Sequence, residues 1–151
     1  MSDESGAVRA AELAVDFAAF GHRDALAVGE RMLRDALDAG RAVTIALWLG
    51  EQRVFHAALP GTSADNDRWV ERKAALVRRY DASSWLTTLR FREHGIEDRL
   101  EHMGLDGRYA LSGGGVPIRV RGTQVGVLVV SGLAEQEDHR IALEALAAHA
   151  G

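Results

Sequence analysis

Two β-hairpin patterns, separated by helical sequence, constrain the fold of this chain more than any other feature. In the first pattern, residues 43–49 are apolar or β-branched and predict a buried strand. Residues 50–52 (Gly-Glu-Gln) turn the chain, and residues 53–59 return as a second strand. Because the turn is so short, the two strands are expected to be antiparallel neighbours.

The second hairpin pattern comprises residues 116–120 and 124–130, joined by an Arg121-Gly122 turn. Within it, the run 125–130 contains no polar side chain, which predicts a central strand covered on both faces. Two hairpins with helices between them imply a mostly antiparallel sheet. They do not fit the strict alternation of strand and helix in a dinucleotide-binding fold.

Helical periodicity accounts for much of the remaining chain. Apolar residues recur at helical spacing before Gly40, which gives a stop signal. A further helix is expected to begin at Thr62 or Ser63, with acidic residues in its first turn. The predicted helices cover residues 24–39, 62 or 63 to 80, 84–92 and about 135–149.

A short strand at residues 13–17 completes the predicted order, β-α-β-β-α-α-β-β-α. The expected fold class is therefore α/β (α+β), with a central, mostly antiparallel, five-stranded sheet and flanking helices. At 151 residues the chain is long enough for one domain. We expect this domain to span residues 12–151, preceded by a flexible N-terminus at residues 1–11.

Composition excludes several classes of function. The chain has no cysteine, which rules out a disulfide scaffold, a thiol nucleophile and a cysteine-ligated metal site. Its 18 basic and 22 acidic residues give a net charge of −4 without a basic cluster, which argues against nucleic acid as a partner. No apolar run is long enough to span a membrane, and the acidic start is unlike a secretory signal. We therefore expect a cytoplasmic protein with no membrane partner.

Lys73, the only lysine, lies at helical spacing from Trp69, Leu76 and Tyr80. This position favours a side chain whose stem packs on the apolar stripe while its ammonium stays in water. The alternative is a cation at the edge of a pocket, available to a carboxylate ligand.

The sequence at residues 60–67 (Pro-Gly-Thr-Ser-Ala-Asp-Asn-Asp) is typical of a corner between a strand and a helix. In this interpretation Thr62 caps the helix and Asp65 completes a capping box. Alternatively, Thr62, Ser63 and the free N–H groups of the helix bind an anion. The neighbouring carboxylates disfavour that alternative.

The glycine run at residues 112–115, which includes Gly114, is followed by a strand rather than a helix, so it does not match a phosphate-binding loop. A flexible rim of a binding pocket is the functional alternative to a simple turn. Ser131 follows the predicted central strand but lacks the Gly-x-Ser-x-Gly elbow of a hydrolase nucleophile. No catalytic residue is assigned.

Two histidines are candidates for a ligand site. His56 lies in the middle of a predicted strand, where a packing role is the more common one. His139 follows Asp138, a pair that could orient an imidazole toward a ligand or simply form polar surface. Oxygen and imidazole groups at residues 97–102 are interpreted as a solvated face rather than a metal site.

The segment 114–118, the glycines at 122 and 126, and residues 130–132 resemble the haem-degrading-domain family, also called HbpS-like or GlcG-like. Within that family the chain is similar to a branch of small intracellular proteins of unassigned function. The branch motifs match residues 55–63, 65–67, 69, 72–73, 83–84, 130–133 and 137–139. The match covers roughly residues 12–148.

This resemblance implies a profilin-like arrangement of helices around an antiparallel sheet, assembly into homo-oligomers and a link to haem, while the cofactor itself stays unassigned. We therefore expect a cytoplasmic, homo-oligomeric protein that binds a small ligand. Two alternatives remain: an enzyme that binds and degrades haem, and an interaction module without a small ligand. The candidate ligand-binding residues are His56, Thr62, Ser63, Lys73, Gly114, Ser131 and His139.

Overall fold

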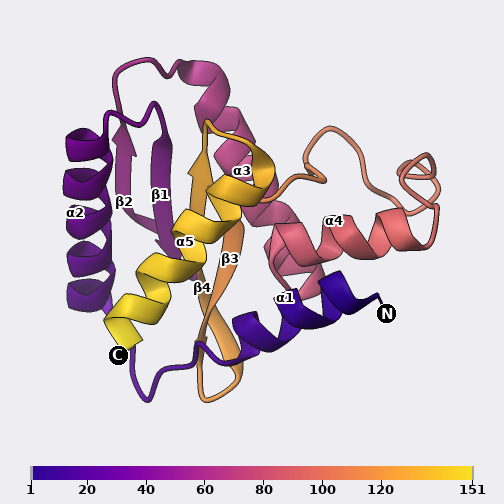
Figure 1. Ribbon diagram of the computed structural model, residues 1–151, viewed down its shortest axis with the longest axis horizontal. Coiled ribbons are helices and arrows are strands. Elements are labelled where there is room, and N and C mark those ends of the chain that lie inside the picture. Colours follow the sequence, from indigo (N-terminus) through magenta and orange to yellow (C-terminus); the bar gives the residue numbers. More distant parts are fainter. Residues whose placement is uncertain (1, 151) are drawn as a thin grey trace.

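The structure is a computed structural model that describes residues 2–150, and Figure 1 shows its arrangement of helices and strands. Its helices are α1 (Asp3–Leu13), α2 (His22–Ala39), α3 (Ala64–Tyr80), α4 (Ser84–Glu93) and α5 (Glu135–Ala150). Its strands are β1 (Thr44–Leu49), β2 (Gln52–Ala58), β3 (Gly115–Val120) and β4 (Thr123–Ser131).

The four strands form one sheet in the order β2-β1-β4-β3, with every pair antiparallel. Both predicted hairpins are therefore confirmed, and they join through β1 and β4, where Thr44 pairs with Ser131. β4 lies inside the sheet, and its last six residues, 126–131, are all buried. The apolar run of β4 is thus a central strand covered on both faces, as its sequence predicts.

Helices cover both faces of the sheet, in the three layers visible in Figure 1. Because successive side chains of a strand point to opposite faces, alternate residues of β1 and β4 enter two different cores. The core beneath α2 and α5 includes Ile45, Leu47, Leu128 and Val130. The core beneath α3 includes Ala46, Trp48, Val127 and Val129.

The N-terminal region differs from the prediction. Residues 13–17 form no fifth strand; Phe17 makes only an isolated bridge to Val120 at the outer edge of β3. Residues 3–11 of the N-terminal segment lie within α1, which Ser2 caps by accepting a hydrogen bond from the Ser5 N–H at 3.2 Å. Acidic residues in the first turn suit the helix dipole.

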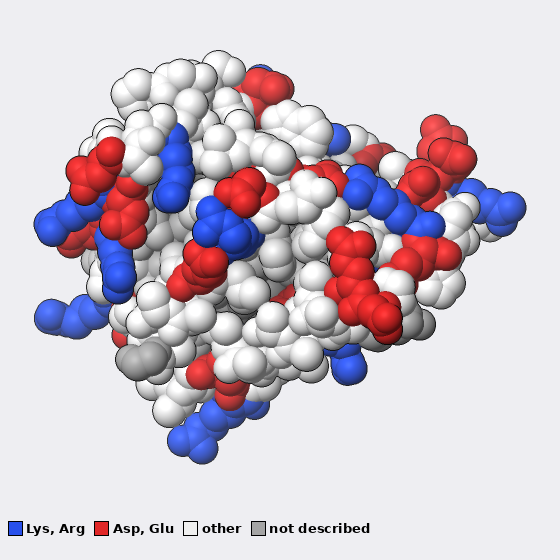
Figure 2. All heavy atoms as spheres, viewed as in Figure 1, with Lys and Arg blue, Asp and Glu red and all other residues white. Residues whose placement is uncertain are grey.

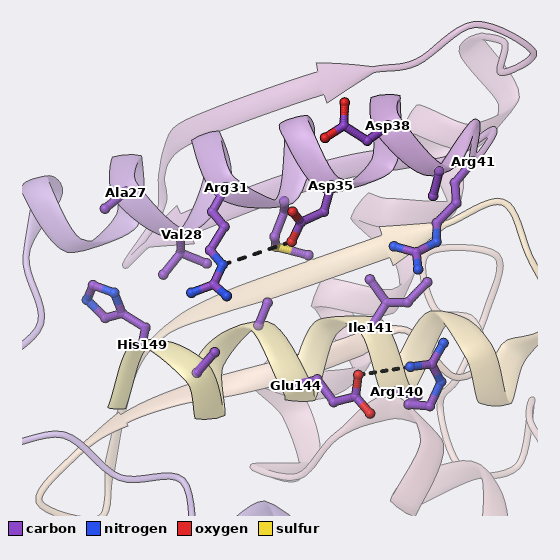
Figure 3. A pocket seen from close by; sticks show the side chains of 14 residues that line it. Ala27, Val28, Arg31, Asp35, Asp38, Arg41, Arg140, Ile141, Glu144 and His149 are labelled. Carbon is purple, nitrogen blue, oxygen red and sulfur yellow. Dashed lines mark hydrogen bonds and ion pairs between the residues drawn. The ribbon is translucent and has the colours of Figure 1, made fainter. Parts of the chain in front are cut away.

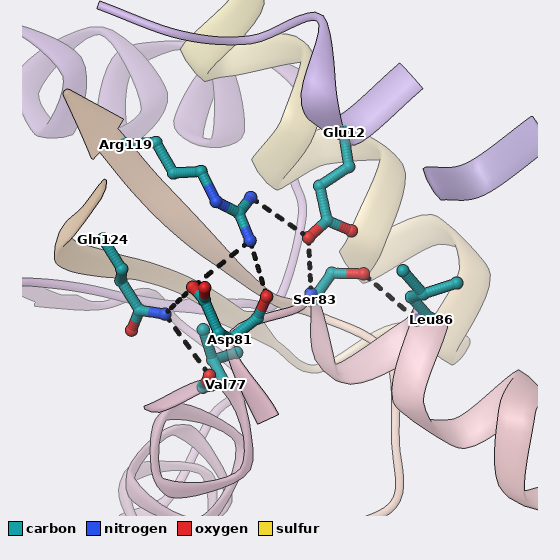
Figure 4. A network of polar contacts seen from close by, with 7 residues as sticks. All are labelled: Glu12, Val77, Asp81, Ser83, Leu86, Arg119 and Gln124. Carbon is teal, nitrogen blue, oxygen red and sulfur yellow. Dashed lines mark hydrogen bonds and ion pairs between the residues drawn. The ribbon is translucent and has the colours of Figure 1, made fainter. Parts of the chain in front are cut away.

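A buried polar network attaches α1 to the rest of the protein (Figure 4). The Arg119 guanidinium of β3 lies 3.4 Å from Glu12 Oε1 and donates to the Asp81 carbonyl at 2.6 Å. The same Glu12 oxygen accepts a hydrogen bond from the Ser83 N–H at 2.8 Å. Both Glu12 and Arg119 are buried, so a carboxylate that looks like surface in the sequence anchors the helix.

Charged side chains of both signs are interspersed on the face shown in Figure 2, which carries no extended field of one sign. Within residues 2–150, no helix combines the length and the apolar character that crossing a membrane requires.

Candidate functional site

A groove of about 700 Å³ runs between α2 and α5 on one face of the sheet (Figure 3). Its volume lies within the range of roughly 300–1,000 Å³ that is usual for small-molecule sites. The residues that line it are Ala27, Val28, Arg31, Met32, Asp35, Asp38, Ala39, Arg41, Arg140, Ile141, Glu144, Ala145, Ala148 and His149.

The floor of the groove is apolar. Val28 and Met32 of α2 are buried in the core, and Ile141 and Ala145 of α5 pack against that core. α2 places its residues there because its apolar positions follow the helical period. The floor therefore offers a surface for the apolar part of a ligand.

The rim of the groove is charged, and most of its charges are already paired. Arg31 Nε lies 4.0 Å from Asp35 Oδ2, and Arg140 lies 2.8 Å from Glu144 Oε2. Among residues 2–150, the side chains of Arg41 and Asp38 have no hydrogen-bond or ion-pair partner. Figure 3 shows the Arg41 guanidinium pointing into the groove, so it is a cation available to an incoming anion.

The electrostatic influence of Arg41 reaches α5. The hydrogen bond from Arg140 lowers the pKa of Glu137, and Arg41 adds a smaller attraction in the same direction. Two guanidinium groups, Arg140 on α5 and Arg41 in the loop after α2, therefore act on one carboxylate at this end of the groove. The same positive charge would favour the carboxylate of a ligand.

His149 closes the other end of the groove. Its Nε2 lies 2.9 Å from Asp24 Oδ1, and its ring packs against Phe17 and Phe20. Asp24 also accepts the Gly21 N–H at the start of α2, and this bond and the one with His149 lower the pKa of Asp24. The imidazole is thus held in position by a carboxylate, as a metal-binding histidine often is.

A protein-family model matches most of the chain. The model described as "Haem degrading protein HbpS-like" matches residues 20–147 of the chain. The chain belongs to the HbpS-like family. The family resemblance inferred from its motifs is confirmed.

Relatives of this HbpS-like chain cover most of its length. A UPF0303 protein from Streptomyces avermitilis is 43% identical over 129 residues, which are 84% of this chain and 78% of the relative. The crystal structure of the Ybr137w protein is similar to this chain with a TM-score of 0.88 at 25% identity. The alignment covers 99% of this chain and 89% of the Ybr137w chain. The crystal structure of a PduOC:haem complex shares the fold, with a TM-score of 0.72 at 18% identity. That alignment covers 86% of this chain and 94% of the PduOC chain.

The groove residues fit the chemistry of a haem in three respects. The apolar floor suits the porphyrin ring, the unpaired guanidinium of Arg41 suits one of its carboxylates, and His149 would offer iron its Nδ1, because its Nε2 is bound to Asp24. The fit is one of residue types, drawn from the lining of the groove.

None of the seven residues predicted to bind a ligand lines this groove. Lys73 is 2% exposed and is neither snorkelling nor at a pocket edge. Its Nζ donates to the Val130 carbonyl at 3.1 Å and to Asp138 Oδ2 at 3.2 Å. The carboxylate of Asp138 also accepts the N–H groups of Gly132 and Leu133 at 3.2 and 3.0 Å. The carboxylate that pairs with Lys73 is therefore Asp138 of the protein itself rather than a ligand.

Burial shapes the electrostatics of this HbpS-like core. It lowers the pKa of Lys73 and raises that of Asp138, and the attraction between the two side chains opposes both shifts. Burial also lowers the pKa of His139, to about 4. Within residues 2–150, His139 Nδ1 has no hydrogen-bond partner, so this ring is a buried neutral imidazole.

Two further predicted residues lie beside the Lys73–Asp138 pair. Gly114 passes so close that a Cβ atom on it would lie 2.8 Å from Lys73 Nζ. Ser131 is buried at the end of β4, one residue after the carbonyl that Lys73 binds. The structure thus places Gly114 and Ser131 beside the buried Lys73–Asp138 ion pair, and His139 follows Asp138 in the chain.

The remaining predicted residues lie near the N-terminus of α3. The Thr62 hydroxyl donates to the Leu59 carbonyl at 2.7 Å, so Thr62 is not the cap. Ser63 is the N-cap, and Asn66 rather than Asp65 completes the capping box. His56 on β2 lies 3.0 Å from Asp67 at the surface. These contacts make the segment the corner between strand and helix that its sequence indicates.

Sequence reasoning missed the groove because its residues look like an ordinary solvated helix face. Arg31, Asp35 and Asp38 follow helical spacing on α2, and Arg140 and Glu144 do so on α5. Only the juxtaposition of the two helices turns these faces into opposite walls. The one local signal is Arg41, directly after the Gly40 that ends α2, and a single cation after a helix is common.

Proposed function

We propose that this protein binds a planar, amphiphilic anion of the haem type in the groove between α2 and α5. The observation that carries the proposal is the combination of an apolar floor with Arg41, a guanidinium that has no partner within residues 2–150 and points into the groove. Family membership supports haem as the ligand to test first. When bound, haem would supply the redox chemistry, while the groove supplies the binding.

A haem titration followed by absorbance tests this proposal, using a variant that fills the groove. Ala148 is exposed and lines the groove, so Ala148→Trp narrows it without disturbing the core. Ala147 is the exposed neighbour outside the lining, which makes Ala147→Trp the matched control. We expect saturable binding in the parent protein and in Ala147→Trp, and its loss in Ala148→Trp. Equal binding by both variants would place the ligand elsewhere.

Removing the free cation tests how the ligand is held. We expect Arg41→Gln to weaken haem binding about tenfold, because one charge-assisted hydrogen bond contributes about 1.5 kcal/mol or more. Arg9→Gln removes a distant, exposed charge of α1 and is the control. His56→Ala and His139→Leu belong in the same titration. A specific loss of binding in either would move the site toward the residues that the sequence singles out.

We also propose that the protein acts as a cytoplasmic homo-oligomer. Four large apolar side chains among residues 2–150 are exposed, namely Leu13, Leu26, Leu37 and Leu133. Two of them, Leu26 and Leu37, lie on the same face of α2, and this face is the candidate interface. Sedimentation of the purified protein measures the assembly directly, and a monomer at micromolar concentration would contradict this part of the proposal.

A further inference from the structure

The two edge strands of the sheet, β3 and β2, differ in whether another segment pairs with their outer side. At the outer edge of β3, the Phe17 N–H donates to the Arg119 carbonyl and the Arg121 N–H donates to the Phe17 carbonyl, both at 3.0 Å. At the other edge, β2 pairs with β1 alone, and nothing in residues 2–150 pairs with its outer side. β2 has a bulge at Val54, because Leu47 and Trp48 of β1 pair with Phe55 and Arg53, so its regular open edge comprises residues 55–58. An open edge of this kind is a template for another strand.

A row of leucines on α2 lies beside this open edge. Leu26 and Leu37 are 48% and 54% exposed, and Leu33 is half-buried. At about 100° per residue, the three fall within roughly 40° of one another around the helix. Gly29, on the adjoining flank, lies directly against the ring of Phe55 on β2. The leucine row and the β2 edge therefore form one surface, on the side of α2 away from the groove.

From this arrangement we infer that a second copy of the chain docks here, pairing β2 with β2 and α2 with α2 about a twofold axis. The inference rests on the homo-oligomer proposed above and names its surface. Two β2 edges related by a twofold axis meet antiparallel, so the two four-stranded sheets become one of eight strands. Such a contact is isologous, as in most symmetric dimers.

The spacing of the helices agrees with this arrangement. α2 packs on both β1 and β2, so it lies over that pair of strands. With strands about 4.8 Å apart, two copies of α2 placed on a continuous sheet lie about 10 Å apart. Helices pack at about 8–10 Å. Strand pairing and helix packing are therefore satisfied at the same time, which two unrelated surfaces would not achieve.

The side chains of α2 are also complementary to themselves. In an antiparallel pair of these helices, Leu26 of one copy faces Leu37 of the other, with Leu33 near the axis. The same alignment brings Glu30 opposite Arg34. These two residues already form an exposed ion pair within one copy, so the dimer would contain a network of four alternating charges. A partner with a different sequence has no reason to match this row in reverse order.

Charge reversal of the apolar row tests the inference. In Leu26→Arg/Leu37→Arg, two exposed side chains change, so the monomer should fold while like charges face each other in the dimer. We expect sedimentation to show an assembly of smaller mass, with far-UV circular dichroism unchanged. The matched control is Leu133→Arg, an exposed leucine elsewhere, which should leave the mass unchanged.

Hydrogen exchange separates strand pairing from simple helix contact. We expect the amides of β2 to be protected in the parent assembly and to exchange faster in Leu26→Arg/Leu37→Arg. The absence of natural cysteine allows a second measurement. Leu33→Cys should form a covalent dimer on mild oxidation, whereas Asp35→Cys, on the groove side of the same helix, should not.

The outcomes distinguish the two proposals. A monomeric parent protein would overturn the homo-oligomer and this surface together. An oligomer whose mass is unaffected by Leu26→Arg/Leu37→Arg, and whose Leu33→Cys variant forms no covalent dimer, would overturn this surface and leave the homo-oligomer standing. Loss of mass with no change in β2 exchange would retain the α2 contact and refute the continuous sheet.

Discussion

Lys73 of α3 and Asp138 of α5 form an ion pair inside the protein, with 3.2 Å between Nζ and Oδ2. The two residues are 65 positions apart in the chain. Through the Val130 carbonyl and the N–H groups of Gly132 and Leu133, the pair also holds the end of β4. The ion pair therefore joins two helices on opposite faces of the sheet. It does so at the end of the sheet where β4 ends and where β1 and β3 begin.

We predict that either single substitution, Lys73→Met or Asp138→Asn, destabilises the protein by about 3–5 kcal/mol, because each leaves a buried charge without its partner. The double variant should cost less than the sum of the two, by about 2 kcal/mol. Urea unfolding of the four proteins measures this coupling. Additive free energies of unfolding would show that the two charges do not stabilise each other.

His139 predicts a pH dependence of stability. The unfolded chain protonates this histidine below about pH 6.5, whereas burial holds the folded pKa at about 4. The stabilisation that comes from keeping His139 neutral is therefore fully present above about pH 6.5, and it is lost as the pH falls toward 4. The loss is at most about 3 kcal/mol.

Urea unfolding at pH 7.5 and pH 4.5 checks the effect of His139. We expect His139→Leu to lose less stability between these two pH values than the parent protein does. His102 is an exposed histidine, and His102→Gln should leave the parent difference intact. If His139→Leu and the parent lose equal stability, the imidazole is not buried in its neutral form.

Much of the fold could be predicted because its signals are local. The two hairpins and the buried run of β4 follow from turns and apolar runs of a few residues, and the structure confirms them. The N-terminal region could not be predicted in this way. Residues 13–17 are apolar enough for a strand, yet Leu13 ends α1 and residues 14–17 follow it. The position of α1 is fixed by a buried Glu12 that has no local signature.

The candidate site is harder to predict for the same reason. Lys73 is unusual in the sequence because it is a single lysine on an apolar stripe, but its partner Asp138 lies on another helix. The groove depends on the contact between α2 and α5, which no local pattern specifies. Sequence reasoning thus finds residues with special environments, while the arrangement of helices decides what those environments are.

Gly114 is predicted to be intolerant of any side chain. Its φ of +137° is rare for residues with a Cβ atom, and a Cβ there would press on the Val130 carbonyl and on Lys73. Gly114→Ala should therefore cost at least about 2 kcal/mol of unfolding free energy. Gly21 is the control, because its φ is −132° and a Cβ added to it would meet no atom within 4 Å. Thermal unfolding that affects both alanine variants equally would contradict the prediction.

The attachment of α1 should depend on a single carboxylate. Glu12 is 3% exposed and lies against Arg119 and the Ser83 N–H, so Glu12→Ala leaves a buried guanidinium with only Asp81 beside it. We expect a loss of about 3 kcal/mol and faster hydrogen exchange over residues 3–13, because few other buried side chains hold this helix. Glu4→Ala, which removes an exposed carboxylate from the first turn of the same helix, should change exchange far less. Unchanged protection of α1 in Glu12→Ala would show that packing, rather than the ion pair with Arg119, holds the helix in place.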